Sequence, residues 1–250
     1  MKIGYLITAR MKSTRLKHKL TLEINGRQII RWMIDRLKLA KSIDEIIICT
    51  STNPQDDILV QIAFEEGIKI FRGHEEDVIQ RLYDAAIENK LDYALNITAD
   101  CPLVSIEYIE KIIEEYKNNN ADLVRTLDLP HGFYSYGLKV EALKRVCELK
   151  NGTDTEVWGR YFTDTGLFNV VDLEIPTELI RNDFRLTLDY PQDFDFFNAI
   201  YSHFGNATYS VGISEIIQFL DDNPEIVSIN KDLKKSYKER WDSQNQIKLK

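Results

Sequence analysis

Short apolar segments and longer amphipathic segments alternate along the first half of the chain, and this alternation restricts the fold more than any other feature of the sequence. In segment 105–119, Ile106, Ile109 and Ile113 recur at a spacing that places them on one face of a helix. Continuous apolar runs such as IIIC are typical of strands buried on both faces. The expected strands are 2–8, 44–51, 68–71 and 92–98, and the expected helices are 28–42, 56–67, 76–90 and 105–119. This order predicts right-handed βαβ units, and therefore an α/β fold with a mostly parallel, Rossmann-like sheet flanked by helices.

The regular pattern is interrupted between residues 127 and 183, where prolines and glycines divide the chain into shorter pieces. We expect this region to be a small excursion that carries contacts to a substrate or to another subunit. A strand at 183–190 and, from Pro191, a helix to residue 204 restore the pattern. A chain of 250 residues with 44% hydrophobic content can bury a substantial core, and we interpret residues 1–250 as a single domain.

Five basic residues follow the first expected strand, although the chain carries a formal net charge of −8. They are Arg10, Lys12, Arg15, Lys17 and Lys19. Ligands of open parallel sheets bind beyond the carboxyl ends of the strands, so this loop predicts an anion site; the alternative is a solvated charged surface. In such a site Arg10 and Arg15 hold phosphate oxygens, Ser13 and Thr14 donate hydrogen bonds, and Lys19 supplies a point charge. The patterns GxxxxGK[ST] and GxGxxG are absent, so the loop is neither a P-loop nor a dinucleotide-binding turn.

Two aspartates stand at the ends of expected strands, each two residues before a proline. Asp100 ends the strand that reads NIT, and Asp189 ends the strand that reads LTL. Because both strand ends point to the same edge of the sheet, the two carboxylates are candidate ligands for one Mg²⁺ ion. The alternative for each aspartate is a helix N-cap.

Composition and charge exclude several classes of protein. The acidic balance argues against nucleic acid as the main partner, since phosphate-backbone binding needs an extended basic face. No apolar run approaches the roughly 20 residues of a membrane helix. The N-terminal segment MKIGYLITAR contains too few apolar residues for a signal peptide. We therefore expect a cytoplasmic protein without membrane insertion. The three cysteines lack any CxxC pairing and suggest neither a disulfide framework nor a zinc site.

Five motifs in this order carry a resemblance to a known family. They are AR-x-x-S-T-R-L-x-x-K-L at 9–20, N-G at 25–26, FRG-x-E-x-DV-x-x-R at 71–81, T-x-DCPL at 98–103 and TLD-x-P-x-D at 187–193. Together they resemble the bacterial cytidylyltransferases of surface-sugar biosynthesis. This group includes the 3-deoxy-manno-octulosonate and acylneuraminate cytidylyltransferases and the spore-coat polysaccharide cytidylyltransferase-like proteins. The similarity is good over about 3–125 and again over 184–197.

The resemblance implies transfer of CMP from CTP to an acidic sugar or a related surface-polysaccharide precursor, with release of pyrophosphate and with Mg²⁺ as cofactor. It places Ala9, Arg10, Ser13, Arg15 and Lys19 on the triphosphate-binding loop. It places Asp100 and Asp189 on the metal ligands, so Arg10, Arg15, Lys19, Asp100 and Asp189 are the candidate catalytic residues. Cys101 is expected to be a small packed residue, because this reaction needs no covalent nucleophile.

The chain departs from the family pattern at two places. Lys17 and His18 stand where relatives usually carry Pro and Gly, so the turn before Lys19 must be made by residues with less suitable backbone preferences. Ala99 stands where the aspartate motif commonly has Gly. A glycine at this position would let the backbone approach the nucleotide more closely.

The remaining candidate residues are weaker. We expect Arg72 and Asp77 near the nucleoside, with a helix N-cap as the alternative for Asp77. Candidates for contact with the acceptor are His131, Tyr134, Tyr136, Glu156 and Arg160. Residues 130–170 hold seven aromatic side chains that a small excursion would not readily bury alone, which predicts a homodimer: Phe133, Tyr134, Tyr136, Trp158, Tyr161, Phe162 and Phe168.

Two other functions compete with the cytidylyltransferase hypothesis. The first is a metal-dependent nucleotide-sugar glycosyltransferase of related α/β build. Such enzymes usually show D-x-D after a strand, and the sequence ADCP lacks the second aspartate. The second is a catalytically silent relative that binds a nucleotide or a partner enzyme. This hypothesis is unnecessary, because the sequence contains the complete set of basic and acidic candidate residues.

Overall fold

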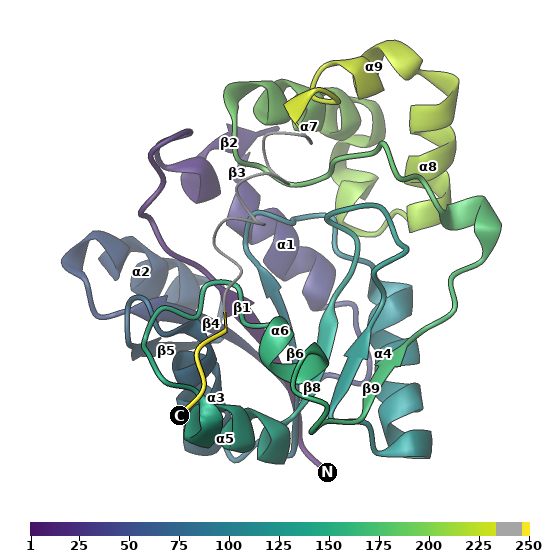
Figure 1. Ribbon diagram of the computed structural model, residues 1–250. Helices are drawn as coiled ribbons and strands as arrows, with labels where there is room; N and C mark the ends of the chain where they lie inside the picture. The colour runs from purple at the N-terminus through teal and green to yellow at the C-terminus, as the bar shows by residue number, and fades with distance from the viewer. Residues whose placement is uncertain (234–246) are drawn as a thin grey trace.

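The computed structural model describes residues 1–233 and 247–250, and its centre is a seven-stranded sheet with helices on both faces (Figure 1). The strand order is β5-β4-β1-β6-β8-β7-β9. In that order the strands span Lys69–Gly73, Glu45–Ser51, Ile3–Thr8, Tyr93–Thr98, Tyr136–Lys139, Leu123–Arg125 and Val170–Asp172. All neighbours are parallel except the two pairs that β8 makes with β6 and β7. The predicted mostly parallel sheet is therefore confirmed.

The four predicted crossover helices are also present. They are α1 (Ile29–Leu37), α2 (Asp57–Glu65), α3 (Val78–Glu88) and α4 (Ile106–Asn119). Alternate side chains of β1 enter different clusters, because successive residues of a strand point to opposite faces. Tyr5 and Ile7 pack in the apolar layer that contains α1, α2 and α4, whereas Leu6 packs in the layer that contains α3. The continuous apolar run of β1 is thus explained by helices on both faces.

Residues 127–183 contribute two strands to the sheet. β8 lies between β6 and β7, and β9 forms the edge beyond β7. Gly137 of β8 permits a close approach, because a Cβ atom there would lie 2.1 Å from the hydroxyl oxygen of Tyr93. The helices α5 (Val140–Leu149) and α6 (Arg160–Thr163) follow β8 and pack in the same layer as α3. The region predicted as an excursion is therefore partly built into the sheet.

The strand predicted at 183–190 is wrong. This segment is extended, but it makes only an isolated bridge between Arg185 and His131, with Leu186 N–H donating to the His131 carbonyl at 2.7 Å and Leu188 N–H to the Asp100 carbonyl at 2.8 Å. Its apolar alternation has another cause, since Phe184, Leu186 and Leu188 are buried in a separate cluster with the C-terminal helices. The predicted helix is confirmed as α7 (Pro191–Phe204), and α8 (Ile213–Asp222) and α9 (Pro224–Ser228) follow it.

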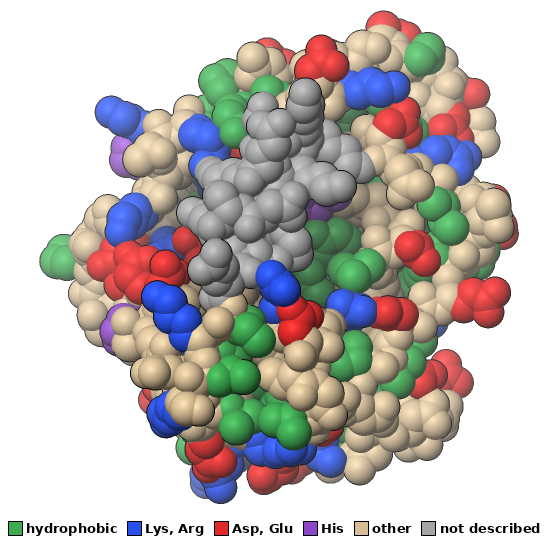
Figure 2. Space-filling view, in the orientation of Figure 1, with side chains coloured by type: hydrophobic (Ala, Val, Ile, Leu, Met, Phe, Trp, Pro, Cys, Tyr) green, Lys and Arg blue, Asp and Glu red, His purple; other side chains and the backbone are tan. Residues whose placement is uncertain are grey.

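The aromatic residues at 130–170 are covered within this chain. Phe133, Trp158, Tyr161 and Phe162 are buried, and the other three of the seven are half-buried. The expectation that they need a second subunit to cover them is therefore wrong. Five of them pack with α3, α5, α6 and the sheet, and Phe133 and Tyr134 pack in the cluster that contains α7 and α8. Figure 2 shows acidic and basic side chains interspersed on one face of the described part of the molecule. Within that part, no helix is long and apolar enough to cross a membrane.

Candidate active site

A cavity of about 480 Å³ lies beyond the carboxyl ends of β1 and β6. Its wall comes mainly from five parts of the chain: the loop after β1, the end of β6, residues between 131 and 136, residues 156–159, and Thr187 with Asp189. Ten of the predicted site residues line it: Ala9, Arg10, Ser13, Arg15, Lys19, Asp100, His131, Tyr136, Glu156 and Asp189. The fold thus brings together residues that are as much as 180 positions apart.

The basic loop after β1 is held in shape by a buried carboxylate. Asp56 accepts a hydrogen bond from Met11 N–H at 2.7 Å and another from the Ser51 hydroxyl. Near its far end, His18 adopts φ 56° and ψ 25°, a left-handed conformation that is uncommon for residues other than glycine. His18 therefore makes the turn before Lys19 in a conformation that glycine adopts more readily. The short 3₁₀ turn η1 (Lys19–Thr21) begins directly after it.

Asp100 and Asp189 converge on the ammonium group of Lys19. Lys19 Nζ lies 2.6 Å from Asp100 Oδ2 and 2.9 Å from Asp189 Oδ1. Burial alone acts to lower the pKa of Lys19, but the two aspartates raise it above the usual value, so the side chain stays charged. Burial of Asp189 acts to raise its pKa, but Lys19 and Arg15 outweigh this effect, so the pKa lies well below its usual value. Asp189 is therefore ionised throughout the neutral range.

Arg15 binds the same oxygen of the Asp189 carboxylate that Lys19 contacts. Its Nη2 atom lies 2.7 Å from Asp189 Oδ1, and its guanidinium packs over the ring of Tyr190 with 5.1 Å from Cζ to the ring centroid. Its Nε atom is buried without a hydrogen-bond partner. A buried donor without an acceptor is costly, so this corner of the cavity favours an anionic ligand.

Neither aspartate is the N-cap that was considered as an alternative. The N-cap of α4 is Ser105, whose side chain accepts from Tyr108 N–H at 3.2 Å. The N-cap of α7 is Tyr190, and Asp193 accepts from the N–H groups of Asp189 and Tyr190 at 2.8 and 2.9 Å. Both carboxylates thus remain available to the cavity, which both residues line.

A second buried layer fixes the position of Asp189. Arg185 is fully buried and contacts Asp189 Oδ2 and Asp193 Oδ1, each at 3.1 Å. Asn230 also donates to Asp193 at 2.9 Å. Sequence reasoning missed Arg185; its signal was a basic residue inside an otherwise apolar buried segment four residues before Asp189.

The two carboxylates fit a divalent cation in part. Both reach within 3 Å of one nitrogen atom, so Asp100 and Asp189 are the residues that would supply anionic oxygen ligands to a divalent cation at that point. In residues 1–233 and 247–250, no group of three or more histidine, cysteine or acidic side chains is arranged to hold a metal ion. A bound Mg²⁺ would therefore complete its shell with phosphate oxygens and water, as it usually does in nucleotide sites.

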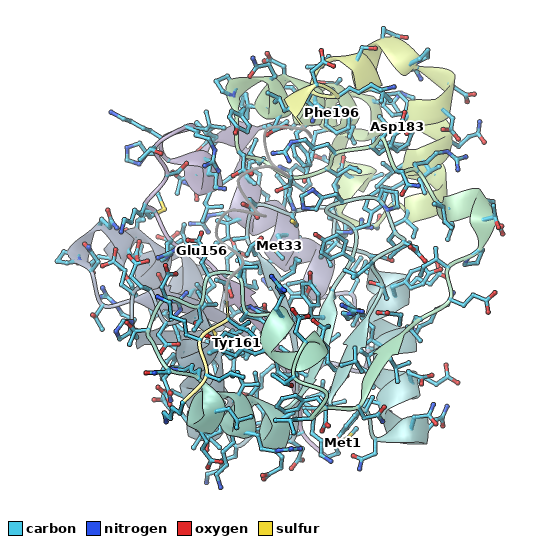
Figure 3. All side chains as sticks on the ribbon, in the orientation of Figure 1. Met1, Met33, Glu156, Tyr161, Asp183 and Phe196 are labelled. Carbon is cyan, nitrogen blue, oxygen red and sulfur yellow. The ribbon has the colours of Figure 1, made fainter. Side chains whose placement is uncertain are left out.

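Two other cations of the loop, Arg10 and Lys12, pair with a separate acidic group. Arg10 lies 3.2 Å from Glu76 and 3.5 Å from Glu156, and Lys12 lies 2.8 Å from Glu76. Glu156 lies on the loop between α5 and α6 (Figure 3). Arg10 and Lys12 are therefore paired with carboxylates from two other parts of the chain.

Aromatic side chains form the wall opposite the basic loop. The rings of His131 and Tyr134 are stacked with centroids 5.6 Å apart, and Tyr136 lies edge-on to Tyr134 at 5.7 Å and to Trp158 at 5.1 Å. Burial raises the pKa of Tyr136 to about 12, so its hydroxyl stays protonated. Trp158 was not predicted as a site residue; its only signal was its place in an aromatic-rich region.

Three predicted residues lie outside the cavity lining. Arg72 binds the carbonyls of Ser51 and Asn53, both at 2.9 Å. Asp77 caps α3 through Gln80 N–H at 3.2 Å, which is the alternative considered for it, and it also forms a buried ion pair with Lys150. Arg160 is exposed and pairs with Asp164 one helical turn later. The structure therefore does not bring these three residues into the cavity.

Cys101 follows Asp100 and also lines the cavity, but it is only 2% exposed. Burial, together with the charge of Asp100, raises the pKa of its thiol well above the usual value. The thiolate form is therefore strongly disfavoured, in agreement with the interpretation of Cys101 as a packed residue.

Comparison with known proteins identifies the family. The model of the family described as cytidylyltransferase matches residues 5–207. The chain belongs to the cytidylyltransferase family. It is a CTP-dependent nucleotidyltransferase, and its basic loop, both aspartates and the aromatic wall all lie inside the matched range. This finding favours the cytidylyltransferase hypothesis over the glycosyltransferase hypothesis.

Individual relatives agree with this assignment. An uncharacterized protein of Methanocaldococcus jannaschii is 37% identical over 96% of this chain and 99% of its own. The spore coat polysaccharide biosynthesis protein SpsF of Bacillus subtilis is 27% identical over 89% of this cytidylyltransferase and 95% of its own chain. A solved cytidylyltransferase from Leptospira borgpetersenii is 26% identical and superposes with a TM-score of 0.83 over 91% of this chain and 97% of its own.

Proposed function

We propose that this cytidylyltransferase transfers CMP from CTP to a hydroxyl group of an acidic sugar, or of a related precursor of a surface polysaccharide. In this reaction an acceptor oxygen forms a bond to the α-phosphorus, and the bond from that phosphorus to the oxygen that bridges to the β-phosphate breaks. The leaving pyrophosphate takes the electron pair, and the proton of the acceptor hydroxyl passes to solvent. The observation that carries the proposal is the convergence of Lys19, Asp100 and Asp189 at one point of a single cavity.

The basic loop is suited to bind the triphosphate. Arg15 and Lys19 reach the centre of the cavity, and Arg10 and Lys12 extend the positive charge toward Glu76. In-line displacement at phosphorus needs positive charge held where the leaving group becomes more negative, and fixed cations supply this without reorganisation. Ser13 and the adjacent backbone N–H groups can donate to phosphate oxygens.

Asp100 and Asp189 are the residues that would hold Mg²⁺. A bound Mg²⁺ would neutralise charge on the triphosphate. The Asp189 carboxylate is kept ionised by its cationic neighbours and is held in place by Arg185, so it is preorganised for this role. Asp100 is the more exposed of the two, with 17% of its side chain accessible against 5% for Asp189.

The acceptor end of the cavity is formed by the aromatic wall. His131, Tyr136 and Glu156 supply hydrogen-bonding groups there, and Tyr134 and Trp158 supply flat apolar faces of the kind that pack against a sugar ring. Arg10 lies 3.5 Å from Glu156, so a cation is within reach of a carboxylate on the acceptor. The name of the Bacillus subtilis relative and that of a 3-deoxy-manno-octulosonate cytidylyltransferase, 28% identical over 60% of this chain, support a sugar acceptor.

The experiment measures pyrophosphate release from CTP and Mg²⁺ with a panel of acceptors. The panel pairs acidic sugars with neutral sugars of the same ring size, and ATP, GTP and UTP replace CTP in parallel reactions. We expect release that requires both CTP and one acidic sugar. Release that is equal for all four nucleotides would contradict the assignment to CTP, and release with neutral sugars alone would contradict the acidic acceptor.

A matched pair of variants tests the site itself. Tyr136→Phe removes one hydroxyl from the acceptor wall and is expected to raise the KM for the acceptor more than the KM for CTP. Tyr161→Phe removes a hydroxyl from a neighbouring buried aromatic residue that does not line the cavity. Equal effects of the two substitutions would contradict the position given to the acceptor.

We also propose that the protein is a homodimer. Residues 127–183 are the region in which we place the contact, and Leu127 and Leu167 within it are exposed, at 44% and 48%. Each exposed leucine offers apolar area that association with a second copy would bury.

A further inference from the structure

The ammonium group of Lys19 occupies the point at which Asp100 and Asp189 converge. It contacts both carboxylates, at 2.6 and 2.9 Å, and only 12% of the Lys19 side chain is exposed. Other groups of the protein occupy further hydrogen-bond acceptor positions of the two carboxylates. Asp189 also accepts from Arg15 at 2.7 Å and from Arg185 at 3.1 Å. The second oxygen of Asp100 accepts from the Thr98 hydroxyl.

This arrangement opposes the binding of a divalent cation by itself. A cation that uses both carboxylates needs the oxygen atoms and the space that Lys19 now occupies. Moving a buried ammonium group away from its two carboxylates without a new anionic partner leaves a charge uncompensated, which is strongly unfavourable. A triphosphate removes this obstacle, because its oxygens give Lys19 another anion to bind.

We propose that Lys19 is an internal counter-ion that keeps the two-aspartate site closed to a divalent cation until a nucleoside triphosphate draws it away. Metal and nucleotide then bind cooperatively, and each raises the affinity of the protein for the other by the same factor. The inference rests on the proposed function for the identity of the two metal ligands. It adds an order of events to that function: the metal enters with the nucleotide or after it.

The test measures binding of Mn²⁺ alone, without nucleotide, by electron paramagnetic resonance and by calorimetry. Lys19→Met removes the ammonium group and keeps a side chain of similar length. We expect it to bind Mn²⁺ at least about tenfold more tightly than the wild type does, since coupling between sites is typically worth 5- to 150-fold. Circular dichroism establishes that the variant is folded, and Lys19→Gln provides the same comparison if it is not.

Lys12→Met is the matched control. It removes the same charge from the same loop, but Lys12 contacts Glu75 and Glu76 and neither aspartate. Its Mn²⁺ affinity should stay within about twofold of the wild type, because charges that do not contact the site are screened. In the double variant Lys19→Met with Asp100→Asn, the gain should disappear, because one of the two ligands has lost its charge.

The results separate this inference from the proposed function. An unchanged or weaker Mn²⁺ affinity in both Lys19 variants, or an equal gain in Lys12→Met, would overturn the counter-ion role. These measurements need no CTP turnover, so they stand even if the wild type releases no pyrophosphate. Absence of that release with every acceptor would instead overturn the proposed function.

Discussion

Asp189→Asn should weaken the folded protein as well as the reaction, because Asp189 is the anion on which three cations depend. Its carboxylate contacts Arg15 at 2.7 Å, Lys19 at 2.9 Å and Arg185 at 3.1 Å, and its side chain is only 5% exposed. Asparagine has nearly the same shape but no charge. The substitution therefore removes the attraction between this side chain and the three cations and leaves the packing almost unchanged.

The expected loss of stability depends on which anionic partners each of the three cations retains in the variant. Removing one partner of a buried ion pair commonly costs about 3–5 kcal/mol. Lys19 retains Asp100 and Arg185 retains Asp193, while Arg15 loses its carboxylate but is 28% exposed and gains some solvation. We therefore expect the free energy of unfolding to fall by about 2 kcal/mol, below the full cost for an unpaired buried charge. For a chain of this size that lowers the melting temperature by about 4–8 °C.

Asp100→Asn is the matched comparison. Asp100 is 17% exposed, and Lys19 keeps Asp189 when the charge of Asp100 is removed, so the loss of stability should be below about 1 kcal/mol. Both variants should lose most turnover in pyrophosphate release. The double variant should be scarcely slower than either single variant, because the two carboxylates act as a unit.

Thermal unfolding at pH 7 and assays at saturating CTP and Mg²⁺ measure these quantities. A melting temperature of Asp189→Asn within 1 °C of the wild type, or a larger loss for Asp100→Asn, would refute the reasoning. Wild-type turnover in either single variant would end the metal-ligand role for that residue.

The pH dependence of the Asp189 contribution has a definite sign. The pKa of Asp189 in the folded protein lies below its usual value of 3.8, so its ion pairs stabilise the protein fully above that value. The stabilisation is lost as the pH falls toward the lower pKa of the folded state. The difference in stability between the wild type and Asp189→Asn should therefore be constant above about pH 5 and shrink in more acidic solution.

Four further predictions concern the loop, the nucleotide and the assembly. Arg15→Ala should weaken CTP binding at least about tenfold in calorimetry through loss of a charged phosphate contact, whereas Lys17→Ala, in the same loop but outside the cavity lining, should not. Asp56→Ala should destabilise the fold by about 1–3 kcal/mol and weaken CTP binding, because Met11 N–H loses its buried acceptor; a normal affinity for CTP would contradict the positioning role. With Mg²⁺ present, CTP should raise the melting temperature more than ATP, GTP or UTP, and equal shifts would argue against cytidine specificity. Light scattering at micromolar protein should give the mass of a dimer, and a monomeric mass would refute that prediction.

Local patterns in the sequence were sufficient to predict the first half of the fold. The spacing of Ile106, Ile109 and Ile113 reports one buried face of a helix, and continuous apolar runs report strands covered on both sides. These signals depend on neighbours within a few residues, so a single sequence carries them. The end of β6 before Asp100 could be placed in the same way, and so could the basic loop after β1.

Contacts between distant segments decided the rest. The alternation at 183–190 is the same for a strand in a sheet and for an extended chain covered by helices, so the pattern did not distinguish them. Nothing local to residues 136–139 indicated that they enter the sheet between β6 and β7. The motif at 71–81 predicted Arg72 and Asp77 near the nucleoside, but Arg72 binds the backbone after β4, and Asp77 caps α3 and pairs with Lys150.

In the charged site, too, the sequence predicted part of the arrangement and the tertiary structure decided the rest. The sequence placed Lys19 and Asp100 at one edge of the sheet, because the ends of β1 and β6 and the loops after them are predictable from local signals. Asp189 was expected at the same place from a strand that the structure does not contain. Only the tertiary structure decided that one ammonium group bridges both carboxylates and that Arg185 holds Asp189 from behind. The physical reason is that Lys19 lies 81 and 170 positions from its two partners, so the geometry of these ion pairs depends on how the sheet, the loop after β1 and the segment before α7 pack together.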